Sequence, residues 1–319
     1  MKEFVIDKAS AGKRLDKWLM KEAPSLSVGL MQKYFRQKDI KVNGKHAPKD
    51  AVLNEGDVVR AYVPDEYFVR PKKVDPFLQN YRHNIKVVYE DQHILLVDKQ
   101  PGMMVHPDDT EKVNTLITHV KAYLYQKGEY DSRNPESYAP TPCNRIDRFT
   151  GGVVLIAKTE TAMRILNRKI RDHEIEKDYL CIILGQMREP EGMLENWIFK
   201  NERRVTVLDK EAPGAQIAQT RYFALAENGP LSLVECELLT GRTHQIRAQF
   251  AHAGHPLLGD NQYGDRRVNM QYRREYQALY AYKIVFRFKT DAGELNYLKG
   301  QTFWVKDVPF EVEYFSEVR

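Results

Sequence analysis

The chain has 319 residues, of which 42% are hydrophobic and 29% charged, a composition typical of a soluble globular protein with two or three domains. Its apolar runs are too short to span a bilayer and residues 1–4 lead into mixed charged sequence, so we expect a cytoplasmic protein without a membrane segment. Three scattered cysteines, Cys143, Cys181 and Cys236, argue against a disulfide framework and against a cysteine-based zinc site.

The net charge of +5 is concentrated near the N-terminus. Residues 1–63 hold 13 Lys and Arg against 8 Asp and Glu, whereas the remaining residues hold 36 of each sign. Such an asymmetry indicates that the first part binds a polyanion while the larger part has another task. The alternative from charge alone is a solvated basic face on a small module.

We expect residues 12–63 to form a small α+β unit. A helix begins near Arg14–Leu19, and Ser25 or Ser27 caps a second helix with an apolar stripe of Val28, Met31 and Phe35. Strand-like alternation at 40–42, the hairpin signal Asn43-Gly44 and a further strand within 53–59 complete the unit. Lys33, Arg36 and Lys38 fall largely off the apolar stripe.

Residues 64–83 contain Pro64, Pro71, Pro76 and the basic run Arg70–Lys73 and lack periodicity, which is typical of a linker. Beyond it we expect a pair of strands at 86–89 and 93–97. A helix should open near residues 114–116, and the polar stretch 127–142 should be a loop.

The stretch Asn144-Arg145-Ile146-Asp147-Arg148-Phe149-Thr150-Gly151-Gly152 places one acid where a strand begins. The apolar run 153–157 that follows predicts a buried strand, and the glycine pair allows tight backbone, so Asp147 should be held rigidly at a strand edge. The alternative is that Asp147 pairs with Arg145 or Arg148 on a surface loop.

The rest of the chain alternates one helix with several strands before a second helix. We expect a helix over 160–171, a strand over 177–185 with Tyr179 near its start, and short strands at 205–207, 218–226 and 231–239. The stretch 241–250 enters a helix that ends at Gly254, in which His244 and Arg247 share a face one turn apart. Strands at 281–288 and 301–305 close the chain.

Cofactor motifs are absent from the sequence. The glycine-rich loop at 254–264 matches neither a dinucleotide-binding fingerprint nor a phosphate-binding P-loop. The histidines His244, His252 and His255 are close in sequence, but no H-E-x-x-H pattern and no matching acidic or thiolate set accompanies them. We therefore expect no metal and no cofactor.

Three segments, read in order, resemble the RluA family of pseudouridine synthases: N-R-I-D-R-F-T-G-G at 144–152, K-D-Y-L at 177–180 and G-R-T-H-Q-I-R at 241–247. The D-K-Q-P-G after the second strand, the N-T-L at 114–116 and the G-H-P-L-L-G-D at 254–260 strengthen the resemblance. Near the N-terminus, R-L-D-x-x-L, V-N-G-K and E-G-D-V-V are similar to the S4 RNA-binding domain.

The resemblance implies an α+β fold: a pseudouridine synthase catalytic domain with a mixed, mostly antiparallel sheet flanked by helices and loops, preceded by a small α+β S4-like domain. The implied division is 1–63 for the S4-like RNA-binding domain, 64–83 for the linker and 84–319 for the catalytic domain. The implied activity is isomerisation of uridine to pseudouridine in RNA, with ribosomal RNA of the large subunit as the expected partner and a monomer as the expected state.

The family's reaction breaks the bond from N1 to C1′ of uridine, turns the uracil and rejoins it through C5, so it needs no cofactor. The resemblance implies that Asp147 is the catalytic carboxylate, that Arg247 is its partner and that Tyr179 stacks on the base and can take the proton from C5. Arg145, Arg242 and His244 would bind the substrate. The carboxylate would either add to C1′ or remove a sugar proton to give a glycal, and the sequence leaves both routes open.

The S4-like start implies that its basic residues contact RNA phosphates, which position the nucleic acid more than they read its sequence. These residues are Lys33, Arg36, Lys38 and Lys41.

Four departures from the family pattern accompany these matches. Asn144, Gln249 and Tyr280 stand where the family often has His, and Gly151 stands where it usually has Ser. They leave room for an alternative function, a non-catalytic RNA-binding or ribosome-assembly protein that keeps the fold. A glycosidase is disfavoured because its usual mechanism needs two carboxylates.

Overall fold

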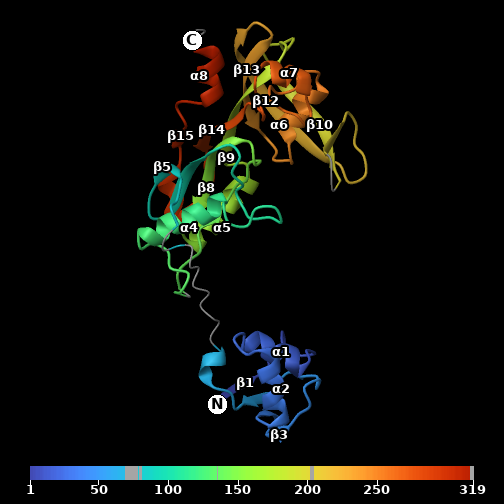
Figure 1. Cartoon of the computed structure of the whole chain (residues 1–319), viewed down its shortest axis with the longest axis vertical. Helices are drawn as coiled ribbons and strands as arrows, with labels where there is room; N and C mark the ends of the chain where they lie inside the picture. The colour runs from blue at the N-terminus through green and yellow to red at the C-terminus, as the bar shows by residue number, and fades with distance from the viewer. Residues whose placement is uncertain (69–77, 79–80, 135, 202–204, 317–319) are drawn as a thin grey trace. The chain divides into compact units, whose positions relative to one another are not determined.

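The computed structural model describes residues 1–68, 78, 81–134, 136–201 and 205–316 (Figure 1). The chain divides into two compact units, Met1–Val74 with Ser132–Asn134 and Asp75–Asp131 with Pro135–Arg319. Most of the expected linker, residues 69–77 and 79–80 with Pro71, Pro76 and the basic run, lies outside the described residues. Within the described ranges, no helix has the length and apolar character to cross a membrane.

The first unit is a four-stranded antiparallel sheet, in the order β1-β4-β2-β3, packed with two helices. Its elements are β1 (Lys2–Val5), α1 (Leu15–Glu22), α2 (Val28–Arg36), β2 (Ile40–Val42), β3 (Lys45–His46), β4 (Val58–Ala61) and the short 3-10 helix η1 (Asp65–Phe68). Tyr67 and Phe68 of η1 pack on the core of this unit, so the unit continues beyond residue 63.

Local signals account for most of this unit. Ser27 caps α2 by accepting a hydrogen bond from the backbone N–H of Leu30 at 3.3 Å, and Met31 and Phe35 are buried beneath the helix. The expected third member of that stripe, Val28, is instead 50% exposed, because Leu26 fills the core position just before the helix. Left-handed backbone at Asn43 and Gly44 closes the hairpin between β2 and β3.

The larger unit is built on an eleven-stranded sheet with the order β11-β10-β12-β13-β9-β14-β8-β6-β5, with β15 beside β14 and β7 beside β8. The β14 and β8 strands run parallel, whereas the other pairs are antiparallel. This confirms the predicted mixed, mostly antiparallel sheet. Its strands are β5 (Lys86–Glu90), β6 (Ile94–Lys99), β7 (Thr141–Pro142), β8 (Gly151–Ala157), β9 (Ile175–Leu184), β10 (Glu191–Lys200), β11 (Val205–Leu208), β12 (Gln216–Asn228), β13 (Leu231–Leu238), β14 (Leu279–Phe286) and β15 (Thr302–Trp304).

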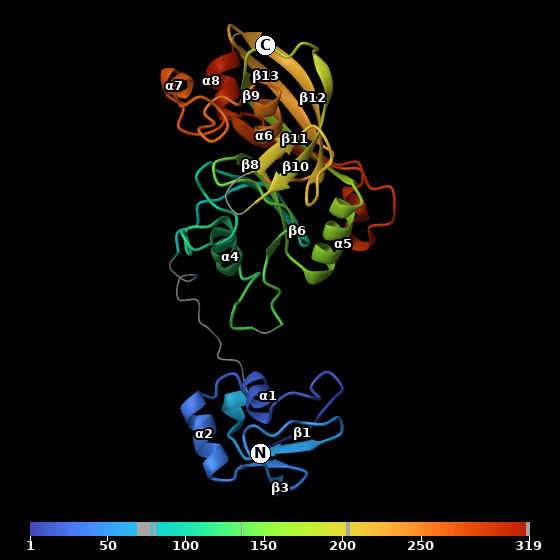
Figure 2. The same ribbon diagram turned by 90° about the vertical axis from the view of Figure 1, so that its right-hand side faces the viewer.

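Helices cover both faces of this sheet, and α4 and α5 lie on opposite sides of β6 and β8 (Figure 2). On one face, α5 and the C-terminal elements share a core with alternate residues of β6, β8, β9 and β14. On the other, α4 packs on β6 and β8, and α6 packs on β9, β13 and β14. The helical elements are α4 (Leu116–Gln126), α5 (Glu160–Arg171), α6 (Gln245–His252), α7 (Arg266–Gln271), η2 (Gly293–Leu298) and α8 (Pro309–Phe315).

The segment that precedes β8 joins the two cores on the second face. Ile146 packs against both the α4 core and the α6 core. Since Asp147 follows it directly, the carboxylate lies at the seam between these two helix-covered parts of the sheet. Asp147 lies in the loop that leads into β8, four residues before the strand begins at Gly151.

Some elements of the larger unit were missed or misplaced from sequence. The ten-residue strand β10 was not expected, because most of its residues are partly or fully exposed and give no apolar alternation. The short α7, η2 and α8 were also missed. The helix predicted to start within 241–250 begins only at Gln245, because His244 adopts left-handed backbone with φ 54° just before it.

Candidate active site

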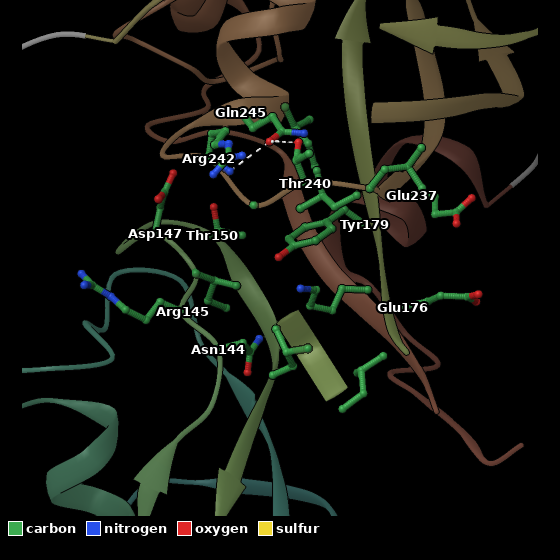
Figure 3. A pocket seen from close by; sticks show the side chains of 18 of the residues that line it. Asn144, Arg145, Asp147, Thr150, Glu176, Tyr179, Glu237, Thr240, Arg242 and Gln245 are labelled. Carbon is green, nitrogen blue, oxygen red and sulfur yellow. Dashed lines mark hydrogen bonds between the residues drawn. The ribbon is translucent and has the colours of Figure 1, made fainter. Parts of the chain in front are cut away.

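A cavity of about 760 Å³ opens beside Asp147 (Figure 3). Its walls come from the loop before β8, the first residues of β9, the end of β13 and the start of α6. All six side chains that the sequence places in the active site line it: Asp147, Tyr179, Arg247, Arg145, Arg242 and His244. These six residues come from three separate segments of the chain, and the structure brings them together in one cavity.

Buried polar contacts hold the backbone around Asp147. Lys99 is 1% exposed, and its ammonium donates to the carbonyl oxygens of Gln100 (3.1 Å), Met103 (2.7 Å) and Arg148 (3.0 Å). The N–H of Gly102 also donates to the Arg148 carbonyl, at 2.9 Å. The three donors of one ammonium therefore tie the Arg148 carbonyl, in the loop that carries the acid, to the turn after β6.

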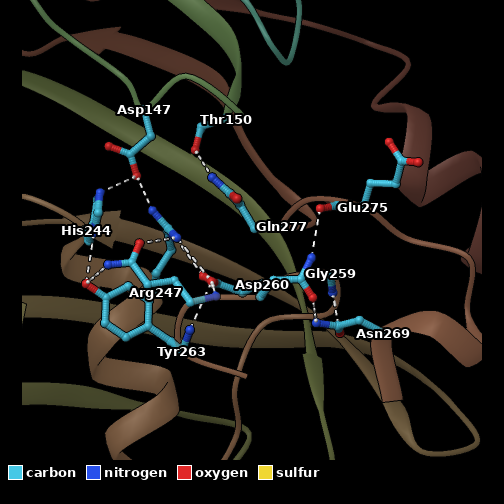
Figure 4. A network of polar contacts seen from close by, with 12 residues as sticks. Asp147, Thr150, His244, Arg247, Gly259, Asp260, Tyr263, Asn269, Glu275 and Gln277 are labelled. Carbon is cyan, nitrogen blue, oxygen red and sulfur yellow. Dashed lines mark hydrogen bonds and ion pairs between the residues drawn. The ribbon is translucent and has the colours of Figure 1, made fainter. Parts of the chain in front are cut away.

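Arg247 connects Asp147 to a second, buried carboxylate (Figure 4). Its Nη1 donates to Asp147 at 3.0 Å, while Nε and Nη2 donate to the two oxygens of Asp260 at 2.6 and 3.1 Å. Nη2 also donates to Gln262 at 3.2 Å. Burial disfavours the charge of Arg247, but Asp260 and Asp147 outweigh it and raise the pKa of the guanidinium.

The two acids differ in access. The side chain of Asp260 is 1% exposed and that of Asp147 is 29% exposed. Since Asp260 occupies one edge of the guanidinium bidentately, Arg247 has one direction left in which to hold Asp147. Asp147 consequently faces the cavity as an oriented carboxylate with part of its surface free for a substrate.

His244 lies on the other side of Asp147. Its Nε2 is 3.7 Å from the Asp147 carboxylate, and its Nδ1 is 2.9 Å from the hydroxyl of Tyr263. Burial lowers the pKa of His244, although the negative charge of Asp147 opposes this shift. The imidazole is therefore neutral near pH 7, and His244 acts as a hydrogen-bonding wall beside the acid.

Tyr179 reaches the cavity from β9 and is 6% exposed (Figure 3). Burial, followed by the negative charges of Asp147 and Asp178, raises the pKa of its hydroxyl far above the ordinary value. The hydroxyl therefore remains protonated at physiological pH. A buried aromatic ring beside an ionised acid suits contact with a planar, uncharged group.

Asp147 pairs with Arg247 rather than with its neighbours in sequence, which was the simpler alternative. Arg148 instead donates through Nε to the carbonyl of Gly102 at 3.0 Å. Arg145 is exposed and has no carboxylate partner among the described residues. Arg242 donates through Nε to the carbonyl of Ile217 at 3.0 Å.

Two of the departures from the family pattern meet in space. Gly151 and Tyr280 face each other across the parallel pair of β8 and β14, and a Cβ at position 151 would lie 2.3 Å from Cε2 of Tyr280. The Tyr280 hydroxyl donates to the buried Asp98 at 2.5 Å. The larger ring at 280 thus explains why a residue smaller than serine is needed at 151.

The other two departures make structural contacts. The side-chain oxygen of Asn144 accepts from the N–H of Leu155 at 2.8 Å, which holds the loop to β8. Gln249 is fully buried, accepts from the Thr220 hydroxyl at 2.7 Å and donates to carbonyl oxygens of Leu194 and Ala218. Neither side chain contacts Asp147.

The sequence did not reveal the partners that position the acid. Asp260 is the last residue of the motif G-H-P-L-L-G-D, and this motif was the only indication in the sequence that Asp260 belongs to the site. Nothing in the sequence indicated that Asp260 pairs with Arg247. Lys99 likewise stands in D-K-Q-P-G. Its burial lowers its pKa to about 7, although the charge of Asp147 opposes this, so Lys99 belongs to the electrostatics of the site.

The histidines considered for a metal point to different partners. His252 lies 2.7 Å from Asp209, and His255 donates through Nδ1 to the carbonyl of Leu184 at 3.1 Å. His244 contacts Tyr263 instead. The described residues contain no group of three or more His, Cys, Asp or Glu that could hold a metal ion.

Of the four basic residues that the sequence assigns to RNA contact, three lie on or just after α2 and the fourth lies on β2. Lys33 and Arg36 are exposed on that helix and Lys38 is exposed just after it. Lys41 on β2 is half-buried, with its ammonium 5.2 Å from the centre of the Tyr62 ring. These cations carry no ion pair with a described carboxylate within 4 Å.

Comparisons with known proteins agree on one family. The family model described as RNA pseudouridylate synthase matches residues 93–252. Ribosomal large subunit pseudouridine synthase C of Salmonella typhi is 31% identical over 82% of this chain and 79% of its own length. An uncharacterized RNA pseudouridine synthase of Aquifex aeolicus is 34% identical over 79% of this chain and 77% of its own.

A solved structure supports the same fold. Human RNA pseudouridylate synthase domain containing 4 superposes with a TM-score of 0.56 at 19% identity, covering 71% of this chain and 90% of that one. At this identity the likeness concerns the fold alone.

The shared guanidinium makes a testable contribution to stability. Replacing Arg247 by Met leaves Asp260 buried without a counter-charge, so we expect the free energy of unfolding to fall by about 3–5 kcal/mol. Urea denaturation measures this change. As a control, Arg287→Met breaks a pair in which Arg287 is 60% exposed, and we expect a loss below about 1 kcal/mol. Equal losses in the two variants would show that Asp260 does not depend on Arg247.

Proposed function

The chain belongs to the RNA pseudouridylate synthase family and is an RNA pseudouridine synthase, and on this premise we propose that Asp147, Arg247 and Tyr179 form its reaction centre. The observation that carries the proposal is the 3.0 Å hydrogen bond from Arg247 to Asp147, made inside a cavity that Tyr179 also lines. Asp147 is the group that acts on the sugar.

An ionised, oriented carboxylate can start the reaction in two ways. It adds to C1′ as a nucleophile, or it removes the C2′ proton to give a glycal, and in both the bond from C1′ to N1 breaks. Arg247 fixes the direction of the Asp147 carboxylate through a charge-assisted hydrogen bond. Since Asp260 holds the guanidinium from behind, Arg247 need not move during the reaction.

Tyr179 supplies the surface for the base. The uracil ring is planar and stacks on an aromatic side chain without requiring a particular hydrogen bond. Because the raised pKa keeps the hydroxyl protonated, Tyr179 receives a proton from C5 only if it passes its own proton on. Stacking is therefore the main role that we assign to it.

The target nucleotide must leave its helix to reach Asp147, since C1′ and the base are inaccessible in a stacked duplex. We assign to Arg145, which is exposed at the cavity, the task of holding the displaced strand, and to Arg242 and His244, which line the same cavity, contact with the nucleotide. Guanidinium groups bind phosphate oxygens through paired N–H donors, which suits this task.

Large-subunit ribosomal RNA is the substrate that we propose, because relatives that cover about four fifths of both chains carry that substrate in their names. We also propose that residues 1–63 form an S4-like RNA-binding domain, that 64–83 are a linker whose first residues, in η1, pack on that domain, and that 84–319 form the catalytic domain. On this account the enzyme works as a monomer in the cytoplasm and needs no metal or cofactor.

Pseudouridine mapping of total RNA tests both the reaction centre and the substrate. Cells that express the wild-type chain should show pseudouridine at defined positions of large-subunit ribosomal RNA that is absent without the gene. Asp147→Asn keeps the shape of the side chain and removes its charge, so we expect the same loss, with single-turnover rates at least about a thousandfold lower.

Pseudouridine sites that persist in the Asp147→Asn strain at wild-type levels would contradict the role of Asp147. Sites confined to another class of RNA would leave the reaction centre intact and contradict the proposed substrate.

The basic residues of the first unit make a second prediction. Phosphate contacts release counterions, so each lost contact flattens the dependence of log affinity on log salt by about 0.7–0.9. We expect the triple change of Lys33, Arg36 and Lys38 to Ala to weaken binding to structured RNA and to lower this slope by about 2. The single-turnover rate at saturating RNA should not change.

The matched control removes three exposed cations of the larger unit that lie outside the cavity: Arg188, Lys299 and Lys306. Titrations at several salt concentrations compare the two variants. A slope that falls equally in both would show that net charge, and not the α2 surface, determines binding.

A further inference from the structure

The end of the cavity beyond Tyr179 contains a lysine to which the proposed reaction assigns no role. Lys177 lies on β9 two residues before Tyr179, so both side chains are on the same face of the strand, about 6.5–7 Å apart along it. Both line the cavity. On the opposite face of β9, Asp178 pairs with Lys283 at 2.9 Å.

Lys177 has no partner for its charge. No hydrogen bond or ion pair joins its ammonium to another side chain or carbonyl in the described part of the chain. The carboxylates that line the cavity are already paired, Asp147 with Arg247, Glu176 with Arg287 at 3.1 Å and Glu237 with Arg221 at 2.9 Å. These pairs leave Lys177, among the described residues, as a cation at the cavity without a carboxylate partner.

Burial makes this arrangement costly without a ligand. Desolvation lowers the pKa of Lys177, and no nearby acid opposes the shift, in contrast to Lys99. An amine in such a setting gains most from an acceptor that carries negative charge, because the surrounding protein screens the interaction weakly.

The position of Tyr179 indicates which part of the substrate lies near this amine. Tyr179 and Lys177 follow one another on one face of β9 inside the same cavity, so a base that stacks on Tyr179 has Lys177 as its neighbour along the strand. A uridine with C1′ at Asp147 and its ring on Tyr179 directs the edge of the base remote from the sugar towards Lys177. That edge carries the carbonyl oxygen O4 beside N3, whereas O2 lies next to N1 and the sugar.

We propose that Lys177 donates a hydrogen bond to a carbonyl oxygen of the target uracil and stabilises the uracil anion released when C1′–N1 breaks. The inference rests on the proposed roles of Asp147 and Tyr179. It makes Lys177 a catalytic residue, because its ammonium touches the group on which charge develops.

The electron count of the reaction explains the need for this charge. When C1′–N1 breaks, its electron pair stays on N1, and the charge spreads over N1, O2 and O4 while Asp147 bonds to C1′ or takes the C2′ proton. The ring then forms the C1′–C5 bond with electrons from C5, which restores Asp147 or returns the C2′ proton. C5 finally loses its proton and N1 gains one, so no atom is gained or lost overall.

The same amine serves the base before and after it turns. Exchanging N1 with C5 rotates the ring about the axis through C6 and N3, and this rotation also exchanges O2 with O4. A carbonyl oxygen therefore faces Lys177 in both orientations. A lysine, whose ammonium is a compact donor on a flexible stem, can follow either oxygen, whereas a planar group would need a new alignment.

Single-turnover kinetics at saturating RNA test the role. For Lys177→Met we expect the rate of pseudouridine formation to fall by about 10²–10³-fold, the effect of removing one donor from a developing anion, with RNA affinity changed less than about threefold. Lys177→Arg should restore part of the rate. Lys289→Met is the matched control: Lys289 lines the same end of the cavity but is exposed, and its variant should keep the wild-type rate.

A substrate with a better leaving group separates this role from structural damage. The 5-fluorouracil anion is more stable than the uracil anion, so it depends less on an ammonium. Lys177→Met lowers the rate with each substrate by some factor relative to the wild type. We expect this factor to be at least tenfold smaller for the loss of 5-fluorouridine from RNA than for the conversion of uridine. The ratio of the two rates is taken within one preparation, so a partly unfolded variant still reports it.

An equal decrease in rate for both substrates would overturn the proposal. An unchanged rate with weaker and less salt-dependent RNA binding would also overturn it, because that result would identify Lys177 as a phosphate contact. Asp147→Asn, run in parallel, separates the two levels of the argument. If that variant is inactive while Lys177→Met is fully active, only the role of Lys177 fails; if Asp147→Asn is active, the proposed reaction centre fails.

Discussion

The arrangement depends on one guanidinium shared by two carboxylates. Arg247 is bound bidentately by the buried Asp260 and presents its remaining donor to Asp147 at 3.0 Å. The bidentate pair with Asp260 sets the plane of the guanidinium, and this plane directs Nη1 at Asp147. The reactive acid is consequently oriented by a residue that is itself oriented by the fold.

The sheet explains how residues so distant in sequence reach this point. Ile146 packs on the α4 core and the α6 core together, so the segment before β8 lies at their seam. The ammonium of Lys99 ties the Arg148 carbonyl to the turn after β6. The acid therefore comes from one half of the sheet, and Tyr179 and Arg247 from the other half.

Residue order and local pattern were enough to predict much of this account. The buried strand after Asp147 and the helix over 160–171 followed from apolar runs, and the mixed sheet and the six cavity residues followed from the family resemblance of three motifs. Features fixed by tertiary contact were missed. Asp260 and Lys177 are ordinary charged residues in sequence, and only the structure shows which of them has a partner. The half-exposed β10 lacked the alternation on which strand prediction depends.

The most direct test of the central claim is the rate of pseudouridine formation by Asp260→Asn. This change removes one charge far from solvent, leaves Asp147 in place and allows Arg247 to turn. If Asp260 orients Arg247 for Asp147, the single-turnover rate should fall by roughly a hundredfold while the chain remains folded, since small misplacements of reacting groups cost about that much. A folded Asp260→Asn variant with the wild-type rate would contradict the account.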